Sequence, residues 1–144
     1  MLKNIHPALG PDLLHALATM GHGDELVIAD AHFPAATTAR RLVRADGVGG
    51  ETLLEAILSV LPLDTFVPVA VHRMEVVGDP GHVPPICDAY ARIVERLAGP
   101  FRIGTIERFA FYERSRRAAY VVASGEQATY ACLILTKGVV ATDL

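Results

Sequence analysis

The sequence places a histidine and an aspartate at the two ends of one apolar run. His22 stands between Gly21 and Gly23, which leaves its imidazole unshielded. Imidazole exchanges protons near neutral pH, so this residue type suits acid–base chemistry. Asp30 follows the run Leu26–Ala29, which is apolar at every position and is typical of a strand covered on both faces. We expect His22 and Asp30 to approach one cleft, either within a chain or from neighbouring subunits.

Each of these residues also has a simpler interpretation. His22 can be an exposed loop histidine whose charge favours the carboxyl end of a preceding helix. Asp30 can be a strand-end residue that accepts hydrogen bonds from nearby backbone N–H groups. Asp30 and His32 can orient each other, or join His22 and Asp24 around a metal ion. Because these histidines lack a zinc-ligand spacing and no cysteine joins them, we expect no metal site.

A second chemistry-bearing segment runs from Glu107 to Arg116 and interleaves charges with aromatic side chains. Charge runs of this kind are usually solvated faces. Yet Phe109, Phe111 and Tyr112 fall within four residues of a chain that is only 6% aromatic. They predict a packed wall beside Arg108, against which either a sugar ring or a partner subunit packs.

Tyr130 ends the polar turn 125–129 and begins a predicted strand. Its phenol can donate a hydrogen bond to a ligand oxygen, although a tyrosine on an edge strand is also common without a ligand. The sequence holds no phosphate-binding, dinucleotide-binding, serine-hydrolase or zinc-protease motif. The run Gly47–Gly50 lacks the Lys and Ser/Thr of a phosphate-binding loop and predicts a turn.

The elements that must position these groups follow from the spacing of apolar residues and from Pro and Gly at their ends. Helices are predicted at 11–20, 53–61 and 86–97, with a short helix or turn at 107–116, and strands at 25–29, 41–45, 67–77, 101–106, 118–123 and 131–136. Residues 31–40 are predicted to form a loop, and Gly21 is expected to end the first helix with a positive φ. This alternation predicts an α/β fold: a single layered domain over residues 1–144, with a mixed β-sheet flanked by helices.

Composition bounds the class of protein. The chain is 51% hydrophobic, so we expect apolar surface to be hidden in subunit contacts. A net charge of −3 gives no sign of a nucleic-acid surface, and no apolar run approaches the ~20 residues of a membrane span. The N-terminus lacks the apolar segment of a secretion signal, and Cys87 and Cys132 stand alone. We therefore expect a reducing, cytoplasmic location.

Several blocks of the sequence resemble the fucose mutarotase/ribose pyranase family, and its fucose mutarotase branch in particular. The blocks are Met20–Glu25, Asp30–Pro34, Arg44–Gly47, Arg108–Glu113, Gly125–Glu126 before Tyr130, and Leu135–Val139. They occur in order and cover almost the whole chain. The first two are shared across the family, whereas the block at 108–113 is similar to the fucose branch.

The resemblance implies a small α/β subunit in a ring-shaped homo-oligomer, commonly a decamer, with sites at subunit contacts. It implies a cofactor-independent isomerase that interconverts the α and β anomers of L-fucose by opening and reclosing the sugar ring. In this family the residue at His22 would be the catalytic acid. The sugar contacts that the resemblance implies are Asp30, Arg108, Tyr130, Ala131 and Cys132.

Two other functions are compatible with these residues. The first is the pyranose–furanose interconversion of D-ribose, because ribose pyranases use the same ring-opening chemistry. A non-catalytic sugar-binding regulator is the other; it would keep Asp30 and Arg108 but would not need His22. The general base is open between Tyr130 and a water relay. Finally, Cys132 stands where the family usually has Asn, and a thiol is a much weaker hydrogen-bonding group than an amide.

Overall fold

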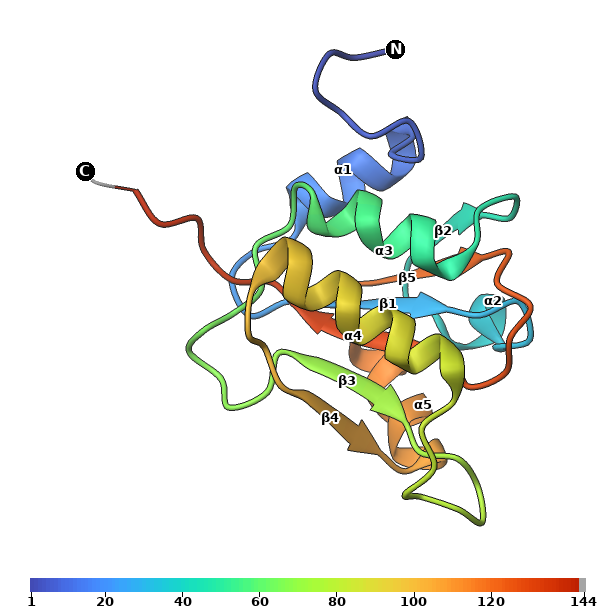
Figure 1. Cartoon of the computed structure of the whole chain (residues 1–144). Helices are drawn as coiled ribbons and strands as arrows, with labels where there is room; N and C mark the ends of the chain where they lie inside the picture. The colour runs from blue at the N-terminus through green and yellow to red at the C-terminus, as the bar shows by residue number, and fades with distance from the viewer. Residues whose placement is uncertain (143–144) are drawn as a thin grey trace.

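A computed structural model of the protein describes residues 1–142. Its six strands join one sheet in the order β2-β5-β1-β6-β3-β4 (Figure 1). The strands are β1 (Glu25–Ala29), β2 (Leu42–Ala45), β3 (Val71–Met74), β4 (Ile103–Ile106), β5 (Tyr120–Ser124) and β6 (Leu133–Thr136). Strand β6 runs antiparallel to both β1 and β3, whereas the other paired strands are parallel. The sheet is therefore mixed, as predicted, and the carboxyl ends of β1 to β5 share one edge.

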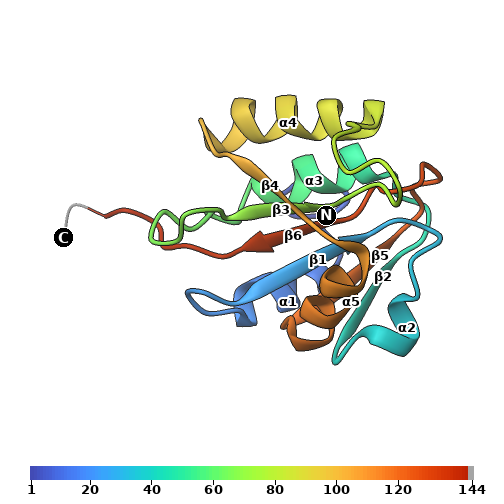
Figure 2. The same ribbon diagram turned by 90° about the horizontal axis from the view of Figure 1, so that it is seen from below.

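Helices cover both faces of this sheet. They are α1 (Pro11–Thr19), α2 (Ala35–Thr38), α3 (Gly50–Leu58), α4 (Pro85–Ala98) and α5 (Arg108–Arg117). Apolar side chains of α1, α3 and α4 form one core with the sheet, and those of α2 and α5 form a second core with it. Figure 2 shows α4 and α5 on opposite sides of the strands. This is the layered α/β architecture that the sequence predicts.

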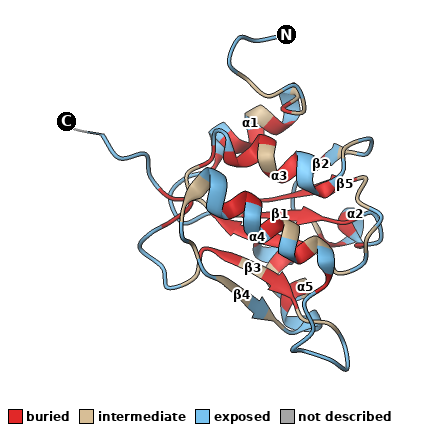
Figure 3. Cartoon of the chain, in the orientation of Figure 1, coloured by how far each residue is buried: buried red, intermediate tan, exposed pale blue. Residues whose placement is uncertain are grey.

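Strand β1 lies in the middle of the sheet, between β5 and β6. Its residues from Leu26 to Ala29 have no exposed surface, and Figure 3 shows the strand in the colour of buried residues. Its alternate side chains enter the two cores. Leu26 and Ile28 pack in the first core, and Val27 and Ala29 in the second. The uninterrupted apolar run is thus explained by burial on both faces. Of the candidate site residues, His22 precedes the amino end of this strand and Asp30 follows its carboxyl end.

The structure corrects several predicted boundaries. The predicted loop at 31–40 contains the one-turn helix α2, and the helix predicted to begin at Leu53 begins at Gly50. The strand predicted at 67–77 shortens to Val71–Met74, because only these four residues pair with β4. The strands β5 and β6 are consecutive in the chain, but β1 lies between them in the sheet.

The end of α1 also differs from the prediction. The helix ends at Thr19, Met20 is extended, and the positive φ of +87° occurs at Gly23 instead of Gly21. The Lys137 ammonium group donates to the carbonyl oxygens of Leu17 and Met20, and so satisfies the acceptors that a helix leaves at its carboxyl end. A distant lysine on the chain segment after β6 therefore closes α1.

Candidate active site

A cavity of about 310 Å³ opens at the edge of the sheet where the parallel strands end. It lies around the neighbouring strands β1, β6 and β3, where the antiparallel β6 interrupts the parallel order. Open α/β sheets bind ligands outside the carboxyl ends of their strands, and this volume is at the lower end of the range for small-molecule sites. The cavity is lined by Asp30, His32, Phe33, Met74, Arg108, Tyr112, Thr129, Tyr130 and Cys132.

Asp30 is a buried carboxylate that the backbone holds in place. Its Oδ1 accepts hydrogen bonds from the amides of His32 and Phe33, each at 3.0 Å, and its Oδ2 accepts one from the Ala131 amide at 3.2 Å. The side chain thus accepts hydrogen bonds from nearby backbone N–H groups, which is the structural role predicted for an aspartate at the end of a strand. A carboxylate offers about four lone-pair positions, so one remains for a hydroxyl group of a ligand in the cavity.

Arg108 reaches the cavity from the first turn of α5. The preceding residue, Glu107, caps this helix by accepting hydrogen bonds from the amides of Phe109 and Ala110, and these bonds lower the pKa of its carboxyl group. The Arg108 guanidinium group lies over the rings of Phe109 and Tyr112 and donates to the Tyr112 hydroxyl at 3.1 Å. Of the three aromatic residues in the predicted wall, only Tyr112 lines the cavity; Phe111 is buried in the second core and Phe109 is exposed.

The segment before β6 supplies the third side of the cavity. The sequence predicts that Tyr130 begins a strand, but the structure places it in a turn before β6. Its φ of +58° lies in a region that non-glycine residues rarely adopt. Its hydroxyl oxygen accepts a hydrogen bond from the Val77 amide. Strained backbone of this kind clusters at binding sites, where the surrounding structure imposes it. From this turn, Tyr130 lines the cavity.

Ala131 and Cys132 occupy different positions at this site. Ala131 does not line the cavity, since its amide donates to Asp30 and its carbonyl oxygen accepts from the buried Tyr90 hydroxyl. Cys132 does line the cavity, and its Sγ accepts a hydrogen bond from the Asp30 amide at 3.3 Å. Burial raises the pKa of the Cys132 thiol well above its usual value, and the neighbouring Asp30 carboxylate raises it further.

His22 lies at the opposite edge of the sheet. Five residues of β1 separate the two edges by roughly 16 Å, so a single chain does not bring His22 into the cavity with Asp30. The half-exposed imidazole has its Nε2 3.0 Å from Oδ1 of the buried Asp64, and its ring packs against Phe66. The Phe66 amide lowers the pKa of Asp64; burial opposes this shift, and His22 adds to it.

Sequence comparison places these residues in a known family. The model of the RbsD / FucU transport protein family matches residues 3–140. The chain is 44% identical over 140 residues to the L-fucose mutarotase of Actinobacillus pleuropneumoniae serotype 5b, covering 96% of this chain and 97% of that protein. It is 47% identical over 148 residues to the fucose mutarotase of Homo sapiens, covering 99% and 96%. The chain belongs to the RbsD / FucU transport protein family.

Solved structures agree with this assignment. The crystal structure of the fucose mutarotase of Streptococcus pneumoniae in complex with L-fucose superposes with a TM-score of 0.91 at 43% identity, covering 97% of this chain and all of that one. The fold of the fucose mutarotase branch is thereby confirmed for this family member. The region matched by the family model contains both ends of β1 and every residue that lines the cavity.

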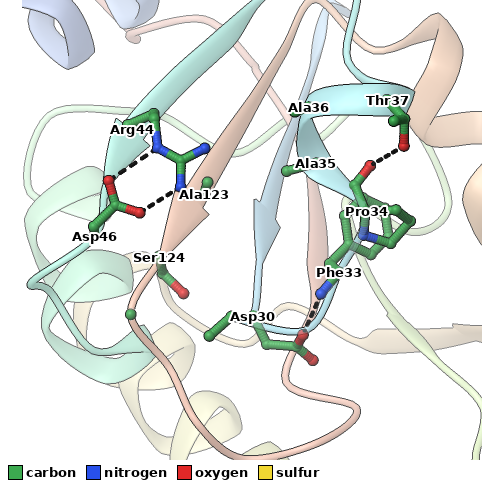
Figure 4. Close-up of a pocket in the computed structure, with 12 residues that line it drawn as sticks. Asp30, Phe33, Pro34, Ala35, Ala36, Thr37, Arg44, Asp46, Ala123 and Ser124 are labelled. Atoms are coloured by element: carbon green, nitrogen blue, oxygen red, sulfur yellow. Dashed lines mark hydrogen bonds and ion pairs between the residues drawn. The ribbon is translucent and has the colours of Figure 1, made fainter.

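A second cavity, of about 420 Å³, adjoins the first in this member of the family and shares Asp30 and Phe33 with it. Figure 4 shows Arg44 paired with Asp46, and the Thr37 hydroxyl group bonded to the Pro34 carbonyl oxygen. Arg44 and Asp46 form a two-pronged ion pair, and the hydroxyl groups of Thr37 and Ser124 donate to backbone carbonyl oxygens. The first cavity is the better candidate for a sugar, because Arg108, Tyr112 and Tyr130 line it and not the second cavity, and their remaining N–H and O–H groups can donate to sugar hydroxyl groups.

Sequence reasoning missed several residues of the site. Asp64 lies 42 positions from His22, so no local spacing connects the pair. Met74 and Thr129 line the cavity without any chemical signature in the sequence. Within residues 1–142, no group of three or more His, Cys, Asp or Glu side chains is arranged to hold a metal ion. No helix in the described part of the chain is long and apolar enough to span a membrane.

Proposed function

We propose that this protein is an L-fucose mutarotase, an isomerase that interconverts the α and β anomers of the sugar. The observation that carries the proposal is the cavity at the carboxyl edge of the sheet. It combines a pre-oriented Asp30 carboxylate, the Arg108 guanidinium group and the aromatic wall of Tyr112, in a volume suited to one monosaccharide. The relatives named fucose mutarotase support the choice of sugar.

The reaction needs only proton transfers. A base takes the proton of the anomeric hydroxyl group, the O–H electrons form the C1 carbonyl, and the bond from C1 to the ring oxygen breaks as an acid protonates that oxygen. Rotation about C1–C2 and reclosure give the other anomer. Asp30 accepts a hydrogen bond from a sugar hydroxyl group and Arg108 donates to others. His22 is the acid, and no cofactor takes part.

A second copy of the chain completes the site in this proposal. His22 and the cavity lie at opposite edges of one subunit, so the acid comes from a neighbouring copy. Phe66 supports this arrangement, because its ring is 73% exposed beside His22 and a neighbour would cover it. Closed rotational symmetry would give every cavity its acid and leave no free edge.

The proposal also covers the oligomeric state of the protein and its location in the cell. We propose a ring-shaped homo-oligomer, with the decamer that the family resemblance implies, working in the cytoplasm. Both Cys87 and Cys132 are free thiols, which suits a reducing compartment. Size exclusion with light scattering, combined with assays of each fraction, tests the assembly. A fully active monomer would contradict both the ring and the shared site.

Saturation-transfer NMR on L-fucose tests the activity directly. Irradiating one anomeric proton should reduce the signal of the other anomer at catalytic protein concentrations, and a chelator should leave the rate unchanged. D-ribose serves as the matched substrate: pyranose–furanose exchange faster than fucose exchange would favour the ribose pyranase alternative. Line broadening of the fucose signals without exchange would indicate a sugar-binding regulator and contradict the proposal.

A further inference from the structure

The His32 side chain lines the cavity beside Asp30, and its hydrogen bonding defines its tautomer. Its Nε2 lies 2.9 Å from the carbonyl oxygen of Gln127. A carbonyl oxygen only accepts hydrogen bonds, so Nε2 carries the hydrogen atom. In the neutral ring the lone pair is then on Nδ1, and among residues 1–142 no donor is hydrogen-bonded to this nitrogen. His32 therefore presents an uncommitted proton acceptor at the rim of the cavity.

The other polar groups of the cavity are less suited to accept a proton. Three backbone amides occupy the Asp30 carboxylate. The hydroxyl oxygens of Tyr112 and Tyr130 already accept hydrogen bonds, from Arg108 and from the Val77 amide, which leaves each of them its own O–H to donate. Phenol groups hold their protons at neutral pH, whereas imidazole exchanges them there. The arrangement makes both tyrosines donors and His32 the acceptor.

We propose that His32 is the general base of the proposed mutarotase reaction, on which this inference rests. Its Nδ1 takes the proton of the anomeric hydroxyl group as the C1 carbonyl forms and the ring bond breaks. The ring oxygen receives a proton from His22 of a second copy, so one proton is taken and one is given. The cation formed on His32 keeps its Nε2–H bond to the Gln127 carbonyl oxygen, which stabilises the positive charge. Reclosure reverses both transfers.

Three variants distinguish a role of His32 as a base from a purely structural role in binding the Gln127 carbonyl oxygen. His32→Ala removes both the acceptor and the donor to Gln127, whereas His32→Asn keeps an N–H donor for that carbonyl oxygen but offers no basic nitrogen. His15→Ala is the matched control, because His15 is exposed on α1 and does not line the cavity. Fucose exchange is measured by saturation transfer, fucose binding by calorimetry, and folding by thermal unfolding.

Both His32 variants should exchange fucose at least about 100-fold more slowly than the native protein while still binding it, and His15→Ala should be unchanged. Added imidazole should raise the rate of His32→Ala in proportion to its concentration. Native exchange in His32→Asn would overturn the inference, because His32 would then act only through Gln127. Loss of fucose binding in both variants would overturn it too. Absent exchange in the native protein would contradict the proposed function itself and this inference with it.

Discussion

The two ends of β1 carry the two chemically distinctive groups of this protein in opposite ways. At the carboxyl end, Asp30 is buried and fixed by three backbone amides that surround it from two segments of chain. At the amino end, His22 is half exposed and its ring is oriented by one distant side chain, Asp64. The first end is complete within a single subunit. The second end presents its imidazole outward.

In the proposed mechanism, this difference separates sugar recognition by Asp30 from proton transfer by His22. A carboxylate that must hold a sugar hydroxyl group gains from a rigid position, because no reorganisation is needed when the ligand arrives. If His22 protonates a ring oxygen in another copy, as proposed, its imidazole has to be accessible at the surface before assembly. The buried Asp64 orients the His22 ring, whereas three backbone amides orient Asp30. Substitutions at each end of β1 test whether the structural and catalytic roles are divided in this way.

The largest effect is expected for His22→Ala. Anomer exchange on L-fucose should fall by about 10²–10⁴-fold, because His22 is the acid that protonates the ring oxygen in the proposed mechanism. The unfolding free energy should change by less than about 1 kcal/mol, since the side chain is half exposed. Saturation transfer and denaturant unfolding on the same sample give both values. Exchange at the native rate would remove His22 from the mechanism.

The opposite pattern is expected for Asp30→Ala. Fucose binding should be lost, and the unfolding free energy should fall by roughly 2–4 kcal/mol, because the buried amides of Phe33 and Ala131 would lose their acceptor. Calorimetric titration with fucose and urea unfolding measure the two effects. If this variant were as stable as His22→Ala, the contrast between a structural end and an exposed end would be wrong.

The sequence predicts each end of β1 separately but not the relation between them. The run Leu26–Ala29 is continuous in the chain, so its burial pattern can be read locally and its strand is placed correctly. The edge at which Met74 and Cys132 meet Asp30 depends on strand order, which pairs β1 with β5 and β6 across about a hundred residues. Such pairing leaves no local periodic signal.

Some residues of the site can likewise be predicted from the sequence, and others cannot. Arg108 follows a predicted strand and belongs to a distinctive aromatic block, so the sequence alone singles it out, and the structure places it at the cavity. The positive φ of Tyr130 is hidden, because tyrosine rarely adopts it and only the tertiary structure imposes it. Ala131 contributes through backbone groups that the protein itself uses. Backbone contacts and strain depend on neighbours that a residue's type does not reveal.

A smaller effect is expected for Asp64→Asn. The amide keeps an oxygen for the Phe66 N–H but replaces the carboxylate that orients the His22 imidazole with a neutral group, so exchange should slow by about 10-fold. Stability gives a second readout. Because the pKa of Asp64 is lowered in the folded protein, its contribution is present above the usual value of about 3.9 and is lost as the pH falls through the folded pKa.

Urea unfolding of native protein and Asp64→Asn at several pH values measures this contribution. The difference in unfolding free energy should be largest at neutral pH and should shrink below pH ~4. A difference that grows as the pH falls would contradict the assigned direction. Asp46→Asn is a suitable control, since the pKa of Asp46 is also lowered, by Arg44, but its carboxylate is exposed and lies at the other edge of the sheet.

The smallest effect is expected for Cys132→Asn, which tests how finely the carboxyl end is tuned. The Asn side-chain oxygen can replace Sγ as the acceptor for the Asp30 amide, and its NH₂ group faces a cavity in which a sugar hydroxyl group can accept from it. Exchange should be unchanged and fucose affinity unchanged or a few-fold higher, because one more hydrogen bond is worth about 1 kcal/mol. Fucose titration of both proteins measures this. Loss of binding in a folded variant would mean that the buried thiol, or the space around it, is itself required by the sugar, and the rigid end of β1 would then depend on Cys132 as closely as on Asp30.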